Sequence, residues 1–229
     1  MIMIIGLRNF CRNRKLRYVS DDEIKTVVGI VQLSAGNAKS VARGLKSVGV
    51  ESIKIEDQKS LGPCSHVILP GVASFGAVVD ELQAKKLFDP IRKLYDTDVR
   101  VIGLCAGMQI MGEESSENPD IKGLGWFDYK CVEIVNKEGK RKFHTGWNSI
   151  EMSENKDILS ASKDVSYYFN HSYFVPATEK KFEQIGLTSY FGSNITSIFL
   201  EKNIVGIQFH PEKSQRAGLS ILKNFVGWR

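Results

Sequence analysis

The sequence RVIGLCAGMQIMGEESS constrains the fold of this chain more than any other stretch. Arg100 to Leu104 is a short apolar run typical of a strand, and Ala106 to Glu114 has the apolar spacing of a helix. Between them stands Cys105, with Gly103 and Gly107 two residues to either side. This spacing predicts a nucleophile elbow, a strand-to-helix turn so sharp that only glycine leaves room beside a strained nucleophile.

Cys105 on its own admits two interpretations. At the N-terminus of a helix, the helix dipole and the unpaired N–H groups favour a reactive thiolate. A free cysteine at a strand end is also commonly a small buried apolar residue without any chemistry. The choice depends on whether the chain supplies a base and a third group that orients the base.

A histidine and a glutamate near the C-terminus supply both groups. The stretch IVGIQFHP (204–211) is typical of a strand that runs directly into His210, and Glu212 follows one residue later. On an extended chain, residues two apart point the same way, so Glu212 can orient His210. A lone His-Pro-Glu is usually an ordinary strand end, but together with the elbow cysteine it predicts a Cys105–His210–Glu212 triad.

The motifs GLCAGMQ and QFHPEKS resemble those of the class I (triad-type) glutamine amidotransferases. Within that family, the chain most resembles the glutaminase subunits of imidazole glycerol phosphate synthase, from histidine biosynthesis. The similar blocks are AGNAKSVARGL (35–45), VILPGVASFG (67–76), GLCAGMQ (103–109), KGLGWF (122–127), HTGWNSI (144–150), YYFNHSYFV (167–175) and GIQFHPEKSQRAGLSILKNF (206–225).

The resemblance implies hydrolysis of L-glutamine to glutamate and ammonia, with no metal and no organic cofactor. It also implies a heterodimer with a (β/α)₈-barrel cyclase subunit. That partner would receive the ammonia through a channel and make imidazole glycerol phosphate and an aminoimidazole carboxamide ribotide.

Apolar strands alternate with amphipathic helices from Val27 onward, which predicts an α/β fold with a mostly parallel central sheet covered on both faces. The resemblance makes this a flavodoxin-like three-layer sandwich of one domain, residues 27–229. The region from Gly123 to Tyr190 is rich in aromatic and β-branched residues, which indicates a small flanking antiparallel sheet. We expect His144 to Asn148 to form a loop there.

Two loops are expected to hold the substrate's reacting end. A tetrahedral oxyanion needs two preorganised N–H donors. One would be Ala106, directly after the nucleophile, and the resemblance places the other in the loop Gly71-Val72-Ala73. That loop is otherwise a simple strand-ending turn. The family usually has glycine where this chain has Ala73, and alanine would slow or bias a backbone flip in the loop.

The remaining site residues follow from the resemblance. Glutamine would be held by Gln109, by Glu117 and by the segment His171-Ser172-Tyr173, although Glu117 also fits a solvated acid. The partner interface and ammonia gate would include Asn37, Trp147, Asn148 and Lys213. Trp147 alone would suggest a core residue, and Lys213 alone a solvated lysine. The stretch Gln32-Leu33-Ser34 departs from the family's Asp-Tyr-Gly near the expected interface.

Composition sets broad limits on function. The 229 residues carry a net charge of +5, which is too diffuse to indicate a nucleic-acid partner. The four scattered cysteines suggest neither a disulfide framework nor a metal site, and no apolar run has transmembrane length, so a reducing cytoplasm is expected. The basic segment 1–26 fits a targeting segment, a simple extension or an upstream start codon.

Three rival functions remain open. A paralogous amidotransferase could feed ammonia to another synthase, such as one amidating a surface sugar, and the departures at Ala73 and at residues 32–34 keep this open. A γ-glutamyl hydrolase of the same fold would need neither Trp147 nor Lys213 at an interface. A regulatory subunit without turnover would not need the triad.

Overall fold

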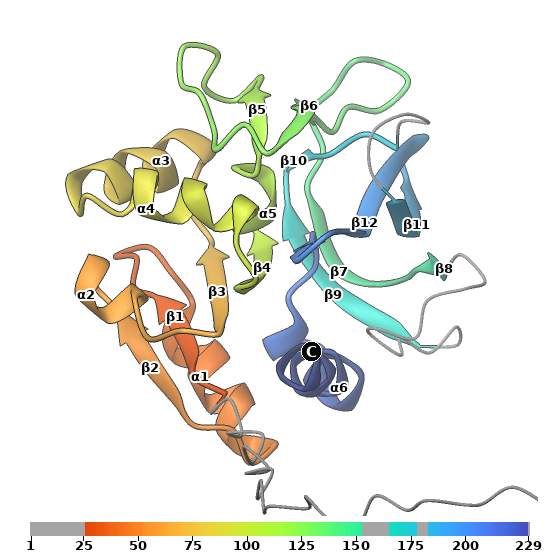
Figure 1. Cartoon of the computed structure of the whole chain (residues 1–229). Helices are drawn as coiled ribbons and strands as arrows, with labels where there is room; N and C mark the ends of the chain where they lie inside the picture. The colour runs from red at the N-terminus through yellow and green to blue at the C-terminus, as the bar shows by residue number, and fades with distance from the viewer. Residues whose placement is uncertain (1–25, 153–164, 178–182, 229) are drawn as a thin grey trace, which may run out of the picture.

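A computed structural model describes residues 26–152, 165–177 and 183–228. The basic segment predicted as an N-terminal extension lies outside the described residues, except for residue 26. Figure 1 shows a central sheet with helices packed around it and smaller sheets beside it.

The central sheet has eight strands in the order β2-β1-β3-β4-β13-β12-β11-β8. The pairings among the first five strands are all parallel, and the remaining three strands join antiparallel. The expected mostly parallel sheet is therefore confirmed. Its strands are β1 (Val28–Val31), β2 (Ser52–Ile55), β3 (His66–Gly71), β4 (Arg100–Cys105), β8 (Glu151–Met152), β11 (Glu183–Tyr190), β12 (Ser193–Glu201) and β13 (Ile204–Ile207).

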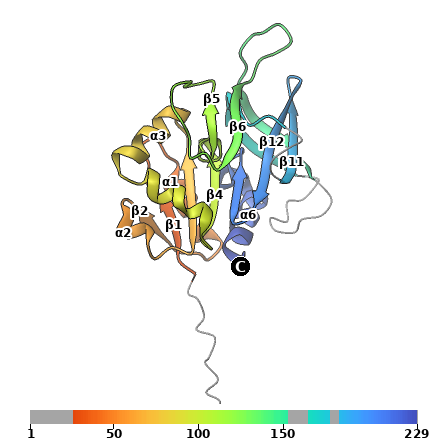
Figure 2. The same cartoon turned by 45° about the horizontal axis from the view of Figure 1, so that its top comes forward.

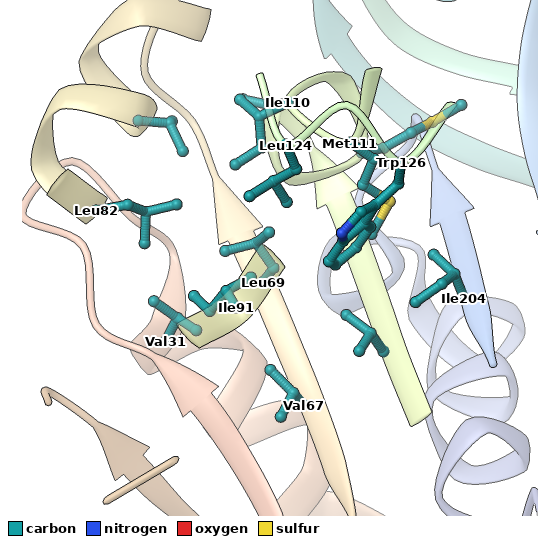
Figure 3. Close-up of a cluster of buried hydrophobic side chains, with 14 of the residues drawn as sticks. Val31, Val67, Leu69, Leu82, Ile91, Ile110, Met111, Leu124, Trp126 and Ile204 are labelled. Carbon is teal, nitrogen blue, oxygen red and sulfur yellow. The ribbon is translucent and has the colours of Figure 1, made fainter. Parts of the chain in front are cut away.

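Two apolar clusters cover the two faces of this sheet, because alternate strand residues point to opposite sides. In β3, Val67 and Leu69 join one cluster, while Ile68 joins the other. The first cluster packs under α3 (Phe75–Ala84) and α4 (Phe88–Arg92), and the second under α1 (Ala38–Ser47) and α6 (Gln215–Gly227). Figure 3 shows the first cluster between sheet and helices. This arrangement confirms the three layers. The short helices are α2 (Gln58–Leu61), α5 (Ala106–Gln109), and the 3₁₀ turns η1 (Lys93–Asp96) and η2 (Pro211–Lys213).

The helix expected from Ala106 to Glu114 is much shorter, so that prediction was wrong. Helix α5 ends at Gln109, and Gly112–Ser115 forms strand β5, which pairs with β6 (Phe127–Glu133). Gly112 lies under the ring of Tyr129, where a β-carbon would come within 2.2 Å of the ring. The pairing partner is distant in sequence, so the local apolar spacing gave no sign of it.

The flanking strands form two small sheets rather than one. One sheet has the order β10-β6-β5, with β10 at Tyr173–Phe174, and its β5–β6 pair is parallel. The other pairs β7 (His144–Ser149) with β9 (Ser166–His171) antiparallel. The expected loop from His144 to Asn148 is therefore a strand. In Figure 2, β5 and β6 lie beyond the ends of β3 and β4. None of the helices in the described ranges has the length and apolar character to span a membrane.

Candidate active site

Cys105 occupies a strained turn at the end of β4, as the elbow motif predicts. Its φ is +53° and its ψ is −110°, a backbone conformation that few residues other than glycine adopt. A β-carbon on Gly107 would lie 1.8 Å from the carbonyl oxygen of Leu69, and one on Gly103 would lie 2.5 Å from Met111. Both glycines are therefore required by close packing around the nucleophile.

Neighbouring strands bring the other site segments to the same edge of the sheet. Gly71, at the end of β3, is in register with Cys105, at the end of β4. On the other side, Ile207 of β13 pairs with Leu104. Because parallel strands end at a common edge, the loop after β3, the elbow and the segment after β13 meet there.

His210 and Glu212 form a buried pair in the segment after β13. The Nδ1 atom of His210 lies 2.9 Å from Oε1 of Glu212, and their side chains are 1% and 0% exposed. The other ring nitrogen, Nε2, is buried and has no hydrogen-bond partner among the described residues. Ser214 fixes the segment, because its hydroxyl donates to the carbonyl of His210 (2.7 Å) and accepts from the amide of Tyr168 (2.9 Å).

The charges of the triad support an ion pair between cysteine and histidine. Burial alone lowers the pKa of His210, but its interactions with a Cys105 thiolate and with Glu212 outweigh burial and raise that pKa to about 9. The imidazolium therefore persists at neutral pH beside the sulfur. Helix α5 has only four residues, so the helix dipole expected from the sequence contributes little here.

Asn37 contacts the triad. Its side-chain amide donates to Oε1 of Glu212 and lies 3.3 Å from Nδ1 of His210. The sequence assigned Asn37 to the partner interface, and the structure places it where it can hold the orienting carboxylate. Its local signal was weak, because the contact joins residues 175 positions apart.

A pocket of about 280 Å³ opens onto Cys105. It is lined by nearly all of the predicted oxyanion and glutamine-binding residues, together with three residues that were given no site role from the sequence, Ser74, Phe143 and Asn170. The full lining is Val72, Ala73, Ser74, Cys105, Ala106, Gln109, Glu117, Phe143, Asn170, His171, Ser172 and Tyr173.

The polar groups of this pocket are held by the chain itself. Glu117 accepts a hydrogen bond from the backbone N–H of Phe75 (2.8 Å). The amide nitrogen of Gln109 donates to the carbonyl of Tyr173 (2.7 Å) and to Oε1 of Gln208 (3.2 Å). Gly71 itself lies against the elbow, since a β-carbon there would come within 2.8 Å of Ala106.

A buried histidine pair stands behind the pocket. His144 and His171 lie with Nδ1 and Nε2 3.1 Å apart, and His171 Nδ1 lies 2.9 Å from the carbonyl oxygen of Tyr173. Burial lowers the pKa of His144 to about 4. Burial, with the neighbouring His144, lowers the pKa of His171 to about 3. Both rings are therefore neutral at physiological pH, and the sequence singled out neither this pairing nor His144.

Two of the four expected interface residues, Trp147 and Lys213, lie against the ring of Tyr168. Trp147 is 49% exposed and packs edge-on against Tyr168, with ring centroids 5.9 Å apart. The Nζ atom of Lys213 lies 5.5 Å from the centre of the Tyr168 ring. Asn148 instead points its amide toward Nε2 of His144, at 3.3 Å. Trp147 is thus a surface residue, which excludes the core interpretation.

Comparison with known protein families matches residues 30–227 to the family described as "Glutamine amidotransferase class-I". Among curated proteins, the imidazole glycerol phosphate synthase subunit HisH of Bacillus velezensis is 32% identical over 87% of this chain and 95% of its own length. The same subunit of Methanocaldococcus jannaschii is 36% identical over 87% of this chain and 98% of its own.

A solved crystal structure of a glutamine amidotransferase shares the fold. It superposes with a TM-score of 0.69 over 88% of this chain and 100% of that one, at 17% identity. Residues that come together at the pocket here thus lie on a scaffold that other proteins of this architecture also use.

Proposed function

The chain belongs to the class-I glutamine amidotransferases, and from this premise we propose that it is the glutaminase subunit of an imidazole glycerol phosphate synthase. The observation that carries the proposal is the buried His210–Glu212 pair that interacts with Cys105, together with the pocket with acceptors for an amino acid that Cys105 lines. The full-length similarity to HisH subunits supports the choice of synthase.

In the first half of the reaction, the Cys105 thiolate attacks the side-chain amide carbon of glutamine. The negative charge that develops on the amide oxygen would be held by N–H groups of Ala106 and of the Gly71–Ala73 loop. The His210 imidazolium, held by Glu212, gives its proton to the departing nitrogen. Ammonia leaves, and a thioester between Cys105 and the glutamyl group remains.

In the second half, the neutral His210 takes a proton from water as the water attacks the thioester carbon. The carbon–sulfur bond breaks, glutamate is released, and Cys105 returns as a thiolate beside a protonated His210. Glu212 keeps the ring in the same orientation through both proton transfers, because its Oε1 stays on Nδ1 and leaves Nε2 for chemistry.

The pocket's acceptors suit the amino-acid end of glutamine. Both described contacts of the Gln109 amide use its nitrogen, which leaves its carbonyl oxygen as an acceptor toward the pocket. Glu117, held by Phe75, adds a carboxylate. These two groups would bind the α-ammonium, while the segment His171–Tyr173 would meet the α-carboxylate.

The surface around the pocket supports a partner that captures the ammonia. Ammonia released into water is protonated and loses its nucleophilicity, so a covered exit is needed. Val72, Phe143 and Trp147 are 45%, 70% and 49% exposed, and Val72 and Phe143 line the pocket. We propose that a barrel-type cyclase covers them and accepts the ammonia, and that the complex works in the cytoplasm.

A second candidate is an amidotransferase that supplies another synthase. It is favoured by Ala73 in the oxyanion loop and by Gln32 and Ser34 in a loop expected near the interface. Ser34 donates from its amide and its hydroxyl to the carboxylate of Glu81, at 2.8–2.9 Å. These contacts hold the loop in place, and a loop of different sequence would present a different surface to a partner.

The deciding experiment measures glutamate release by the purified chain alone, with a histidine-pathway cyclase, and with the cyclase plus its ribonucleotide substrate. Cys105→Ala is the inactive variant, and Cys64→Ala is the matched control, since Cys64 is a buried core thiol. Strong activation by the loaded cyclase, lost only in Cys105→Ala, would support the histidine-pathway assignment.

Two other outcomes would overturn that assignment. Activity that ignores the cyclase would favour another synthase or a hydrolase. A folded chain with no activity under any condition would favour a regulatory subunit.

A further inference from the structure

Gln208 lies beside Cys105, and although it is the first residue of the QFHPEKS motif, the sequence assigned it no role. It directly follows β13, which ends at Ile207, and precedes His210 by two residues. Its backbone N–H donates to the carbonyl of Ser197 (2.9 Å), and its side chain is fully buried. Its Nε2 atom is 3.7 Å from the sulfur of Cys105.

Neighbouring acceptors fix which way the Gln208 amide points. The carbonyl oxygen of Tyr173 can only accept, so the group of Gln109 that faces it at 2.7 Å must be the NH₂. The same NH₂ lies 3.2 Å from Gln208, which must therefore present its oxygen. The NH₂ of Gln208 is then directed at Cys105. In the flipped orientation two NH₂ groups would face each other, and an oxygen would face the sulfur.

We propose that Gln208 is a positioning residue that stabilises Cys105 as a thiolate by donating an N–H···S hydrogen bond. A buried thiolate needs both a counter-charge and donors, because water cannot solvate it there. His210 supplies the charge, and Gln208 supplies a neutral donor whose orientation is set by Gln109 and Tyr173. This role rests on the proposed glutaminase function, because a stabilised thiolate is useful only if Cys105 attacks glutamine. The experiment that tests the hydrogen bond does not require that function.

The test follows alkylation of Cys105 by iodoacetamide as a function of pH, with no glutamine and no partner present. Mass spectrometry of the Cys105 peptide separates this reaction from those of the other cysteines. The variant Gln208→Met keeps length and bulk but removes the donor. We expect the pH of half-maximal alkylation to rise by about one unit, so that alkylation below that pH is about tenfold slower. With glutamine, kcat falls while KM stays near that of the wild type.

Ser197→Ala is the matched control, because Ser197 is equally buried and adjacent but bonds to Thr188 at 2.8 Å rather than to the sulfur. It should leave the alkylation profile unchanged. If Gln208→Met does not fold, Gln208→Asn, which draws the donor back by one methylene, should shift the profile in the same direction.

A folded Gln208 variant with the wild-type alkylation profile would overturn the proposal, whatever its stability. The alkylation readout is independent of the proposed function: a chain that fails to respond to a cyclase would still show the shift if Gln208 supports the thiolate.

Discussion

His144 donates a hydrogen bond to His171, and the direction of that bond follows from its neighbours. The carbonyl of Tyr173 requires the proton on Nδ1 of His171, so Nε2 of His171 accepts from Nδ1 of His144, 3.1 Å away. Nε2 of His144 then accepts from the amide of Asn148, at 3.3 Å. Both rings must stay neutral for this chain of bonds to exist, which links the pocket wall to β7.

The histidine pair should make the protein lose stability in acid. In the folded protein the pKa values of His144 and His171 are lowered to about 4 and about 3, against 6.5 for an ordinary histidine. Below pH 6.5 the unfolded chain binds protons that the folded chain does not, so stability falls as pH falls toward 4. The expected slope is roughly 1.4 kcal/mol per pH unit for each histidine, measured by urea unfolding from pH 7 to pH 4.5.

The matched variant for this prediction is His144→Phe. A phenyl ring suits the site, because His144 stacks on Phe169 and Tyr190 with centroids 4.3 and 4.0 Å away. The slope of the free energy of unfolding against pH should decrease by about 1.4 kcal/mol per pH unit relative to the wild type, which corresponds to one proton. The slope that remains includes His66, whose pKa is also lowered by burial. An unchanged slope in His144→Phe would contradict the neutral pair.

Glu212→Gln should move the alkaline limit of the reaction. His210 has a pKa of about 9 and can donate its proton to the departing nitrogen of glutamine only below that pH. Glutamine keeps the shape of the side chain but removes the charge that favours the imidazolium. The alkaline limb of the kcat profile should therefore move down by about 1–3 pH units. Glu201→Gln, at the end of β12, is the control and should leave the limb near pH 9. If the alkaline limb of the kcat profile stays near pH 9 in both variants, Glu212 does not raise the pKa of His210.

Asn37→Ala separates a triad role from an interface role. The substitution removes the donor to Oε1 of Glu212 and leaves a buried carboxylate poorly bonded, which costs about 1–3 kcal/mol of stability. We expect lower kcat for glutamine in the chain without any partner. Ser40→Ala, which removes only an exposed contact with Arg43, is the control. If kcat of Asn37→Ala is lowered only in the presence of the partner, Asn37 acts at the partner interface and not on Glu212.

Ala73→Gly should raise kcat and lower the free energy of unfolding. Ala73 has a negative φ in this structure, a conformation in which alanine is unstrained. If the oxyanion loop reverses a peptide during catalysis, glycine would ease the step, and kcat should rise about two- to fivefold. The free energy of unfolding should fall by about 0.5–1 kcal/mol. Ala77→Gly, on the exposed side of α3, should cost stability without the gain in kcat.

Local patterns predicted the parts of the site whose residues are close in sequence. The glycines around Cys105 indicated the elbow, because it is set by one turn. The contact between His210 and Glu212 is present, but the extended chain expected there was wrong, since β13 ends at Ile207 and Pro211–Lys213 forms a 3₁₀ turn. The parallel order of the core strands followed from alternating strands and helices. The roles assigned to the glutamine-binding residues remain predictions, although the structure brings them to one pocket.

The sequence did not predict the features that depend on contacts between distant segments. The chain after Gln109 looked helical, but pairing of Gly112–Ser115 with a strand beyond Trp126 turned it into β5. Asn37 reaches Glu212 only because α1 begins beside the end of β13. Gln208 lies two residues before His210, but β13 ends at Ile207, and the contact of Gln208 with Cys105 joins residues 103 positions apart. The strand β7 appeared as a loop because its partner follows about twenty residues later.

The order of the segments along the chain has a consequence for folding. Cys105 lies on β4, but Gln208 joins it only when β13, 103 residues later, docks between β4 and β12. Closing so long a loop costs more chain entropy than pairing strands that are close in sequence. A chain truncated before β13 has the nucleophile but no base, no counter-charge and an open β4 edge. If Cys105 and His210 act as proposed, an unfinished chain cannot hydrolyse glutamine and therefore releases no ammonia.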